Sequence, residues 1–383
     1  MAADPPRGVV PSAAAGGQRL AQVPRGVQCF FGDEARRRRA LESQVVSVFE
    51  GWDYEEIIPP LYDYAEVFSD PDLQPRTLSF MGRDGGVLAL RSDFTSLLAK
   101  IAAGRLSDRP APIRLYYSGE VLRDEPLRTG TQSELYQMGL EHLGGDPRAA
   151  DAEVVAVAAE CLERLGVEGW VVAVGHVGVL GGLAAEAGLA QGALEPLRER
   201  VDAKDAAGVR ALAEQAGASP ECVAALGALI EQTGPPGVLP RLAAALAFCG
   251  PARDALAELT GLVSSLVEAG LGDRVVIDLA EVRGFGYYTG VVLRAYAPGA
   301  GADVGRGGRY DSLLSRFGRP MPAVGFMFGL DRLAALLDGR RPAASGAPPE
   351  AEVVTAAALP DALREARARR ARGARVRLEV PEP

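Results

Sequence analysis

Polar side chains recur at every second position in two neighbouring segments, "YYSGEVLRDE" at 116–125 and "SELYQMGLEHLG" at 133–144. The positions that share one parity are Gly119, Val121, Arg123 and Glu125 in the first segment and Gln137, Gly139 and Glu141 in the second. Successive side chains of a strand point to opposite faces, so pairing of the two segments would place Arg123, Gln137 and Glu141 on one face. Arginine suits an anion, whereas a carboxylate and an amide suit an amine or a ring N–H. A ligand site and a solvent-exposed face with alternating charges explain this pattern equally well.

Two further segments carry candidate ligand-binding residues. "LRSDFT" (90–95) places Asp93 and Thr95 where an expected strand meets an expected helix, although Asp93 on its own is most simply an N-cap. "VRGFGYYTG" (282–290) combines Arg283 with Tyr287 and Tyr288. We expect one of these tyrosines to be buried in the core and the other to line a site. These residues form a site only if the fold brings them together.

Composition and motif content disfavour several classes of function. The net charge of −9 and the pI near 5.1 leave no broad positive surface that would gather nucleic acid. The sequence contains no P-loop, HExxH, GxSxG or GxGxxG motif. The four cysteines lie far apart without a CxxC pair, and only two histidines are present. We therefore expect no disulfide framework, no metal and no bound cofactor, in a protein of the reducing cytoplasm.

No segment is expected to cross a membrane. The most apolar long run, residues 169–190, is interrupted by glycines, by His176 and by Glu186. The first residues contain Pro and Gly where a signal peptide needs an unbroken apolar stretch, so they are predicted to be a disordered leader.

Hydrophobic periodicity predicts the elements that must position these residues. Helices are expected at 32–52, 94–106 and 149–165, a hairpin at 78–93, strands at 113–125, 133–144 and 170–176, and almost wholly helical structure from 179 to 270. After a strand–turn–strand stretch, "DVGRGGRYDSLLSRFG" (303–318) is predicted as a glycine loop that enters a helix. "AVGFMFGLDRLAALLDG" (323–339) is predicted as a buried strand followed by a helix.

This order predicts an α+β protein with antiparallel pairing, interrupted by a helical subdomain. The expected organisation is a leader at 1–23, the first part of the main domain at 24–178, a helical insertion at 179–270, the second part of the main domain at 271–338, a linker at 339–350 and a small βαβ remnant at 351–383.

Taken in order, these segments resemble the catalytic domain of class II aminoacyl-tRNA synthetases, specifically the histidyl-tRNA synthetase family, over roughly residues 24–338. "YEEIIPPLYD" looks like motif 1, with Pro60 at its dimer-forming proline. The two segments of the first paragraph look like motif 2, and "PAVGFMFGLDRL" looks like motif 3, with Arg332 at the arginine that covers adenine. "RGFGYYTG" and "GGRYDSL" resemble the two histidine-specific motifs.

The resemblance implies an antiparallel sheet flanked by helices, a helical insertion and a dimer formed through motif 1. It also implies a histidine site. That site would consist of Asp93, Thr95, Arg123, Gln137 and Glu141, closed by Arg283, Tyr287 and Tyr288.

Several departures from the synthetase pattern bear on activity. Thr131 and Ser133 stand where two arginines grip the ATP phosphates, so that these positions and Arg332 would form a degenerate ATP site. Gly286 replaces the aspartate of "RGLDYY", and little remains of the anticodon-binding domain after residue 350. We therefore expect no tRNA charging and no catalytic residue.

The same family contains non-synthetase members, the regulatory subunits of ATP phosphoribosyltransferase, which "LRSDFT" and the missing anticodon domain resemble. That resemblance implies a histidine-sensing subunit of histidine biosynthesis. It would form a homodimer within a hetero-oligomer with the short catalytic subunit, and it would bind no tRNA. The alternatives are a histidyl-tRNA synthetase or a histidine-activating relative, since Arg283 and Arg332 remain, and a scaffold that has lost ligand binding.

Overall fold

The computed structural model describes residues 22–68, 76–126, 132–282, 286–338, 350–355 and 358–379. Thr131, Arg283 and nearly all of the expected leader and linker lie outside these ranges. Contacts between residues divide the chain into two compact units, and the boundary along the sequence falls between Gly339 and Arg340. In the part of the chain that the structure describes, no helix is long and apolar enough to cross a membrane.

The first unit contains ten α-helices within its described residues. They are α2 (Gly32–Gly51), α3 (Thr95–Gly104), α4 (Pro147–Arg164), α5 (Val177–Glu186), α6 (Gln191–Asp202), α7 (Ala206–Gln215), α8 (Pro220–Glu231), α9 (Leu239–Ala245), α10 (Gly250–Glu268) and α11 (Leu330–Asp338). The strands are β1 (Glu55–Glu56), β2 (Tyr62–Tyr64), β3 (Ser79–Met81), β4 (Val87–Leu90), β5 (Ile113–Leu122), β6 (Glu134–Leu143), β7 (Val171–His176), β8 (Val275–Ile277), β9 (Val291–Tyr296), β10 (Gly305–Arg309) and β11 (Ala323–Gly329).

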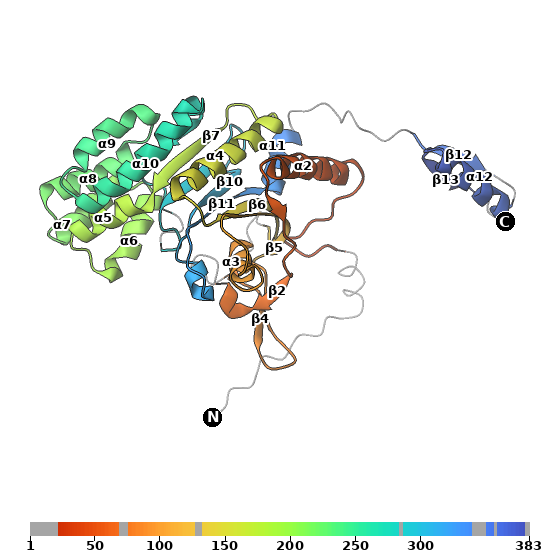
Figure 1. The fold of residues 1–383 in the computed structure, drawn as a ribbon, viewed down its shortest axis with the longest axis horizontal. Coiled ribbons are helices and arrows are strands. Elements are labelled where there is room, and N and C mark those ends of the chain that lie inside the picture. Colours follow the sequence, from red (N-terminus) through yellow and green to blue (C-terminus); the bar gives the residue numbers. More distant parts are fainter. Residues whose placement is uncertain are drawn as a thin grey trace. The chain divides into compact units, whose positions relative to one another are not determined.

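Eight of these strands form one sheet in the order β1-β5-β6-β11-β10-β9-β7-β8 (Figure 1). The edge pairs β1–β5 and β7–β8 are parallel, and the neighbours between them are antiparallel. Helices lie on both faces of the sheet, so the predicted α+β class is confirmed, with mixed rather than purely antiparallel pairing.

The two faces of the sheet differ in what covers them. Alternate residues of β6 and β11, such as Met138, Leu140 and Phe326, are buried in the main core together with α2, α4 and α11. Helix α3 packs on the opposite face (Figure 1), where Phe94 and Tyr117 belong to a second hydrophobic cluster. The polar face predicted from parity is this second one.

Helices α5 to α10 follow β7 and form a bundle. In α10 the stripe Leu256, Leu259, Val263 and Leu266 is buried, as its helical spacing predicts. Helix α10 also contacts α4 and β7, so the bundle is continuous with the sheet. The domain boundaries at 178 and 270 stay a prediction.

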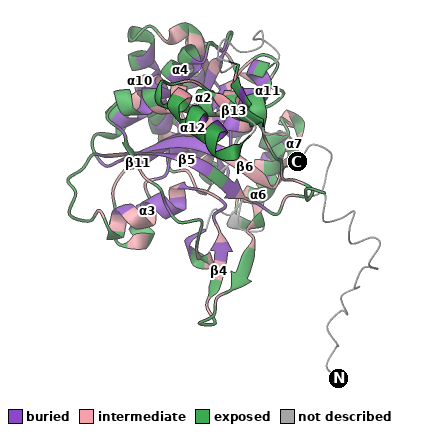
Figure 2. Cartoon of the chain, turned by 90° about the vertical axis from the view of Figure 1, so that its right-hand side faces the viewer, coloured by how far each residue is buried: buried purple, intermediate pink, exposed green. Residues whose placement is uncertain are grey.

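A separate three-stranded sheet, in the order β2-β4-β3, contains the predicted hairpin of β3 and β4 around Asp84. Its exposed end is visible at the bottom of Figure 2. Strand β4 leads through Arg91 into the start of α3 and thereby positions Asp93 and Thr95.

The glycine-rich segment "GRGGRY" is a strand, β10, so the prediction of a loop entering a helix was wrong. Strand β10 lies between β9 and β11, and a side chain at Gly307 would overlap the Gly325 carbonyl of β11. The glycines therefore allow close approach of two strands rather than a loop conformation. Only a short 3-10 helix, η5 (Leu314–Phe317), follows it among the described residues.

The second unit is small. Strands β12 (Glu352–Thr355) and β13 (Val376–Glu379) pair in parallel, and α12 (Leu359–Ala371) connects them. Val354, Ala362 and Ala366 form its buried cluster.

Candidate functional site

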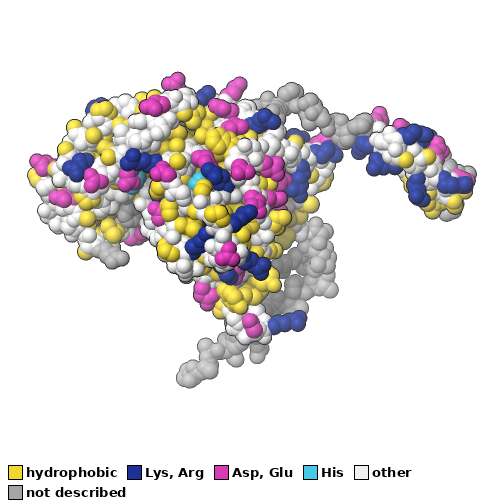
Figure 3. Space-filling model, viewed as in Figure 1, with side chains coloured by type: hydrophobic (Ala, Val, Ile, Leu, Met, Phe, Trp, Pro, Cys, Tyr) yellow, Lys and Arg dark blue, Asp and Glu magenta, His cyan; other side chains and the backbone are white. Residues whose placement is uncertain are grey.

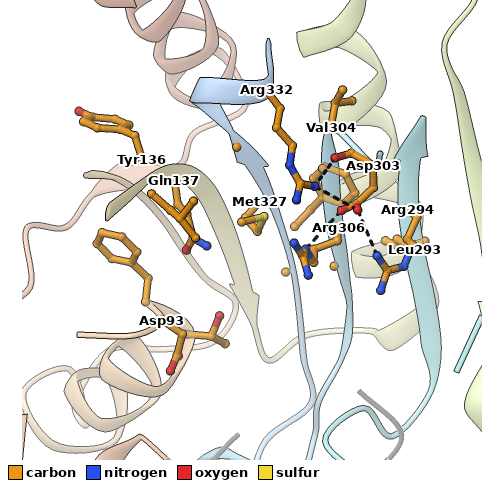
Figure 4. A pocket seen from close by; sticks show the side chains of 18 of the residues that line it. Asp93, Tyr136, Gln137, Leu293, Arg294, Asp303, Val304, Arg306, Met327 and Arg332 are labelled. Atoms are coloured by element: carbon orange, nitrogen blue, oxygen red, sulfur yellow. Dashed lines mark hydrogen bonds and ion pairs between the residues drawn. The ribbon is translucent and has the colours of Figure 1, made fainter. Parts of the chain in front are cut away.

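A cleft of about 820 Å³ lies on the α3 face of the sheet (Figure 4). Strands β5, β6, β10 and β11 contribute side chains to it, together with the first residues of α3 and α11. Eight of the predicted site residues line it. They are Asp93, Thr95, Arg123, Gln137, Glu141, Tyr287, Tyr288 and Arg332.

The alternation inferred from the sequence is confirmed. Strands β5 and β6 pair with Gly119 opposite Gln137 and Leu115 opposite Glu141. Arg123 follows the last residue of β5 and lines the same cleft as Gln137 and Glu141. The face therefore lines a half-open cleft in which Arg123, Gln137 and Glu141 are buried, rather than an ordinary solvent-exposed sheet face.

Glu141 is the most deeply placed acid of the cleft, with 2% of its surface exposed. Its Oε1 accepts a hydrogen bond from the Thr95 hydroxyl at 2.8 Å, and its Oε2 accepts one from the Tyr310 hydroxyl. Burial raises the pKa of Glu141 to about 7, although the two hydroxyl donors oppose this rise, and the nearby Asp93 carboxylate adds to it. Near neutral pH this carboxyl therefore exchanges readily between its charged and neutral forms.

Asp93 lies at the start of α3 and also lines the cleft. Its Oδ1 accepts a hydrogen bond from the Ser96 amide at 2.8 Å, as a residue at a helix start does. Its Oδ2 is buried and has no hydrogen-bond partner within the described ranges. Burial raises the pKa of Asp93, while the bond from Ser96 and the Arg123 charge lower it. A buried oxygen without a donor marks a place for a ligand N–H.

Arg123 and the two tyrosines complete this end of the cleft. The Nε of Arg123 donates to the Ser92 carbonyl at 3.0 Å, which anchors the guanidinium beside Asp93. Tyr287 and Tyr288 are each partly buried and both line the cleft, so the expectation that one would be a core residue was wrong. Their rings lie 5.2 Å apart, edge to face.

Arginines gather at the other end of the cleft, around Asp303 (Figure 4). The Asp303 carboxylate lies 3.4 Å from Arg294, 3.3 Å from Arg306 and 3.1 Å from Arg332. Arg332 also donates to the Asp303 carbonyl at 2.6 Å. Met327 lies between this group of arginines and the end of the cleft that contains Asp93 and Gln137.

Of the three positions predicted as a degenerate ATP site, the structure brings only Arg332 to the cleft. Ser133 is not among the lining residues; its amide donates to the Gly26 carbonyl at 2.7 Å, and its carbonyl accepts from the Arg123 amide. Thr131 lies outside the described residues, as does Arg283 of the predicted histidine site.

The sequence analysis did not name Tyr310, Arg306 or Gly325 as site residues, although "GGRYDSL" contains Tyr310 and "PAVGFMFGLDRL" contains Gly325. Arg306, Gly308 and Tyr310 alternate along β10 and the residue after it, so strand parity would have found them had this segment been recognised as a strand. Gly325 lies opposite Glu141 on β11, where a side chain would overlap the Glu141 carboxylate. This glycine therefore preserves the space that the buried acid occupies.

The arrangement suits a small molecule with N–H groups at one end and an anionic group at the other. Within the described ranges, no group of three or more His, Cys, Asp or Glu side chains is placed to hold a metal ion. A free amino acid with a polar side chain has the required chemistry.

Comparisons with known proteins agree with the resemblance found in the sequence. Residues 26–333 match the family model described as histidyl-tRNA synthetase. A relative from Desulforamulus reducens, named ATP phosphoribosyltransferase regulatory subunit, is 36% identical over 321 residues, which are 84% of this chain and 80% of the relative. A relative of the same name from Geobacter metallireducens is 38% identical over 324 residues, covering 84% and 74%.

Solved structures share the fold. A crystal structure from Bacillus halodurans, described as an ATP phosphoribosyltransferase regulatory subunit/histidyl-tRNA synthetase, has a TM-score of 0.81 at 29% identity and covers 94% of this chain and 93% of that chain. A histidyl-tRNA synthetase from Nostoc sp. PCC 7120 has a TM-score of 0.75 at 24% identity, covering 95% and 86%, and shows the fold alone.

Proposed function

Because the chain belongs to the histidyl-tRNA synthetase family, and within it to the ATP phosphoribosyltransferase regulatory subunits, we propose that it regulates a short-form ATP phosphoribosyltransferase catalytic subunit in the first step of histidine biosynthesis. It does so as a homodimer within a hetero-oligomer. The cleft binds L-histidine as the feedback effector, and the chain itself has no transferase activity.

The observation that carries this proposal is the acidic end of the cleft. Asp93, Gln137 and Glu141 meet there as hydrogen-bond acceptors, and the Asp93 Oδ2 has no donor within the described residues. The ammonium and imidazole N–H groups of histidine supply the donors, and an arginine receives its carboxylate. The tyrosines Tyr287 and Tyr288 close the cleft beside the ligand.

Regulation requires that histidine favour one state of the assembly over another. If the inhibited and active states bound histidine equally, the ligand would shift nothing, however tightly it bound. The difference in affinity between the two states sets the strength of feedback inhibition.

The deciding experiment measures ATP phosphoribosyl transfer by the catalytic subunit from the same genome, alone and with this chain, across a histidine titration. We expect activation by the chain and inhibition by histidine. Glu141→Gln should weaken that inhibition at least about tenfold, because a charge-assisted hydrogen bond contributes roughly 1.5–3 kcal/mol. Glu163→Gln, an exposed glutamate of α4, is the matched control and should leave inhibition unchanged.

The same samples test the alternatives. Histidine-dependent exchange of pyrophosphate into ATP by this chain would favour a histidine-activating enzyme, which Arg332 in the cleft keeps chemically open. Absence of histidine heat in calorimetry, together with activation that histidine does not affect, would favour a scaffold. Absence of any effect on transfer at any ratio of the two chains would refute the regulatory proposal.

A further inference from the structure

The structure points to one arginine, Arg306, as the partner of the ligand's carboxylate, and we infer that Arg306 thereby selects free amino acids over amines that share the same side chain. This inference rests on the proposed function, since it names a contact within the same cleft. Neither parity in the motif 2 segments nor the resemblance singled out this residue.

The pairing of the strands places Arg306 within reach of a ligand held by Glu141. Glu141, Gly325 and Gly308 lie side by side on β6, β11 and β10, and Arg306 is two residues further along β10. Two residues along a strand and two strands across correspond to about 7 Å and about 10 Å between Cα atoms. Both side chains enter the cleft from these positions.

Three glycines lie in the floor of the cleft between the two side chains, with Met327 beside them. Gly308 and Gly325 carry no side chain, and the third glycine, Gly139, lies opposite Met327 in the row that contains Arg306. A side chain at Gly308 would crowd the Tyr288 ring, and one at Gly325 would overlap Glu141. The glycines therefore let the Tyr288 ring and the Glu141 side chain lie close against the sheet, with Glu141 at one end of this floor and Arg306 at the other.

The other arginines of the cleft are held by the protein itself. Arg294 is 3% exposed and lies 2.7 Å from the Glu281 carboxylate and 3.4 Å from the Asp303 carboxylate, although its Nε and Nη1 make no hydrogen bond within the described residues. Arg332 makes two bonds to Asp303, and the Nε of Arg123 is bound to the Ser92 carbonyl.

Within the described residues Arg306 makes a single ion pair, whereas Arg294 makes two and Arg332 donates two hydrogen bonds to Asp303. The Nε of Arg306 lies 3.3 Å from the Asp303 carboxylate but makes no hydrogen bond within the described residues, and 38% of its side chain is exposed. Three guanidinium groups here face two carboxylates, Asp303 and Glu281, which leaves one positive charge in excess. The carboxylate of an amino acid neutralises that charge and supplies the missing acceptor.

The test compares L-histidine with histamine, which has the same imidazole and ammonium groups but no carboxylate. Calorimetry on the full chain gives the dissociation constants of both ligands. Arg306→Gln is expected to raise the dissociation constant of L-histidine at least about tenfold while changing that of histamine by less than about twofold. Arg306→Lys keeps the charge without the planar fork and should fall between wild type and Arg306→Gln for L-histidine.

Arg253→Gln is the matched control, because Arg253 lies on α10, is not among the residues that line the cleft and is paired with Asp254 at 3.0 Å. It should leave the preference for L-histidine over histamine unchanged. If Arg306→Gln weakens the binding of both ligands equally, or affects neither, the role of Arg306 is overturned. The proposed function, which needs only that the cleft bind histidine, is then unaffected. Failure of the wild type to bind either ligand overturns the proposed function and this inference together. Thermal melts of both Arg306 variants verify that the fold is retained.

Discussion

At the scale of single residues, Glu141 is a buried acid of the cleft whose charge depends on pH. Its carboxylate is buried, its two oxygens accept from Thr95 and Tyr310, and its pKa is raised to about 7 by burial. In the empty cleft at low pH this acid is protonated and neutral. It must lose its proton to form an ion pair with a ligand cation. Ligand affinity, proton release and stability are therefore linked at this one side chain.

We predict that Glu141 lowers the stability of the empty protein as the pH rises. The pKa of Glu141 is raised in the folded state from its ordinary 4.5 to about 7, so the folded chain binds more protons than the unfolded chain between these values. The destabilisation by Glu141 is absent below about pH 4.5, and it grows to about 3 kcal/mol in the free energy of unfolding above pH 7. Urea unfolding of wild type and Glu141→Gln at pH 4.5, 6 and 8 measures it.

The difference between the two variants isolates this residue, because other titrating groups contribute equally to both. Glu141→Gln should gain stability relative to wild type as the pH rises, and saturating L-histidine should reduce that gain by favouring the ionised acid. A constant difference across the pH range would contradict the assignment.

A second residue-scale prediction concerns Gly325. Gly325→Ala places a methyl group against the Glu141 carboxylate, so we expect loss of histidine binding and a fall of about 1–3 kcal/mol in the free energy of unfolding. Gly261→Ala in α10 is the control, because its new methyl group meets no atom within 4 Å and a helix interior favours Ala over Gly. Equal behaviour of the two variants in calorimetry and urea unfolding would refute the packing argument.

The sequence predicted the acidic end of the cleft better than the arginine end for a physical reason. Strands β5 and β6 alternate polar and apolar residues, so parity alone assigned Arg123, Gln137 and Glu141 to one face. Arg306 and Tyr310 lie among glycines, whose lack of side chains hides the alternation. The ion pairs around Asp303 join residues from β9, β10 and α11, and no local pattern reports such contacts.

At the scale of secondary structure, a buried ion pair ties β10 to α4. Arg309 at the end of β10 lies 2.6 Å from the Asp151 carboxylate of α4 and donates to the Pro147 carbonyl at 2.7 Å. Burial raises the pKa of Asp151 to about 6, although the Arg309 charge opposes this rise. Arg309 and Arg306 belong to the same short strand, so this tie helps to fix the floor of the cleft.

We predict that Arg309→Met destabilises the protein by about 3 kcal/mol, because it leaves Asp151 buried without its partner. The double variant Arg309→Met with Asp151→Leu removes both charges and should recover most of that loss. Urea unfolding of the two single variants and the double variant at pH 7 forms a complete cycle. A double variant no more stable than Arg309→Met would show that the contacts of Arg309 with Pro147 and Asp311, rather than its ion pair with Asp151, dominate.

Elements with regular periodicity were predicted closely, whereas the glycine strand was not. The buried stripe of α10 and the hairpin at Asp84 match their sequence signals. Strand β10 could not be found locally, because glycine is depleted in strands and its glycines are required by close contacts with β11, with the Val291 carbonyl of β9 and with the Tyr288 ring.

At the scale of the whole molecule, the three-stranded sheet exposes an apolar surface. Ile58 is 85% exposed, Tyr62 and Tyr64 are each 53% exposed, and Phe80 is 42% exposed. Hydrophobic side chains gather in this region in the lower part of Figure 3. A surface of this kind commonly marks a contact with another chain.

We propose that a second copy covers this surface, and we predict a dimer at micromolar concentration by size-exclusion chromatography with light scattering. The double variant Tyr62→Glu with Phe80→Glu should be monomeric, because charges in the centre of an apolar contact oppose association. Val267→Glu on α10 is the control, since Val267 is also exposed, at 45%, but lies outside this surface. A monomeric wild type, or dissociation by Val267→Glu as well, would contradict the assignment.

The order of strands in the large sheet has a consequence for synthesis on the ribosome. Strands β6 and β7 are made early, but their partners β11 and β9 come only after the helical bundle, roughly 120 to 180 residues later in the chain. At translation rates of about 5–20 residues per second, the two strands wait on the order of ten seconds or more with unpaired edges. The nascent polypeptide is then most exposed to aggregation, so its yield in the cell should depend on chaperone capacity more than the stability of the finished protein suggests.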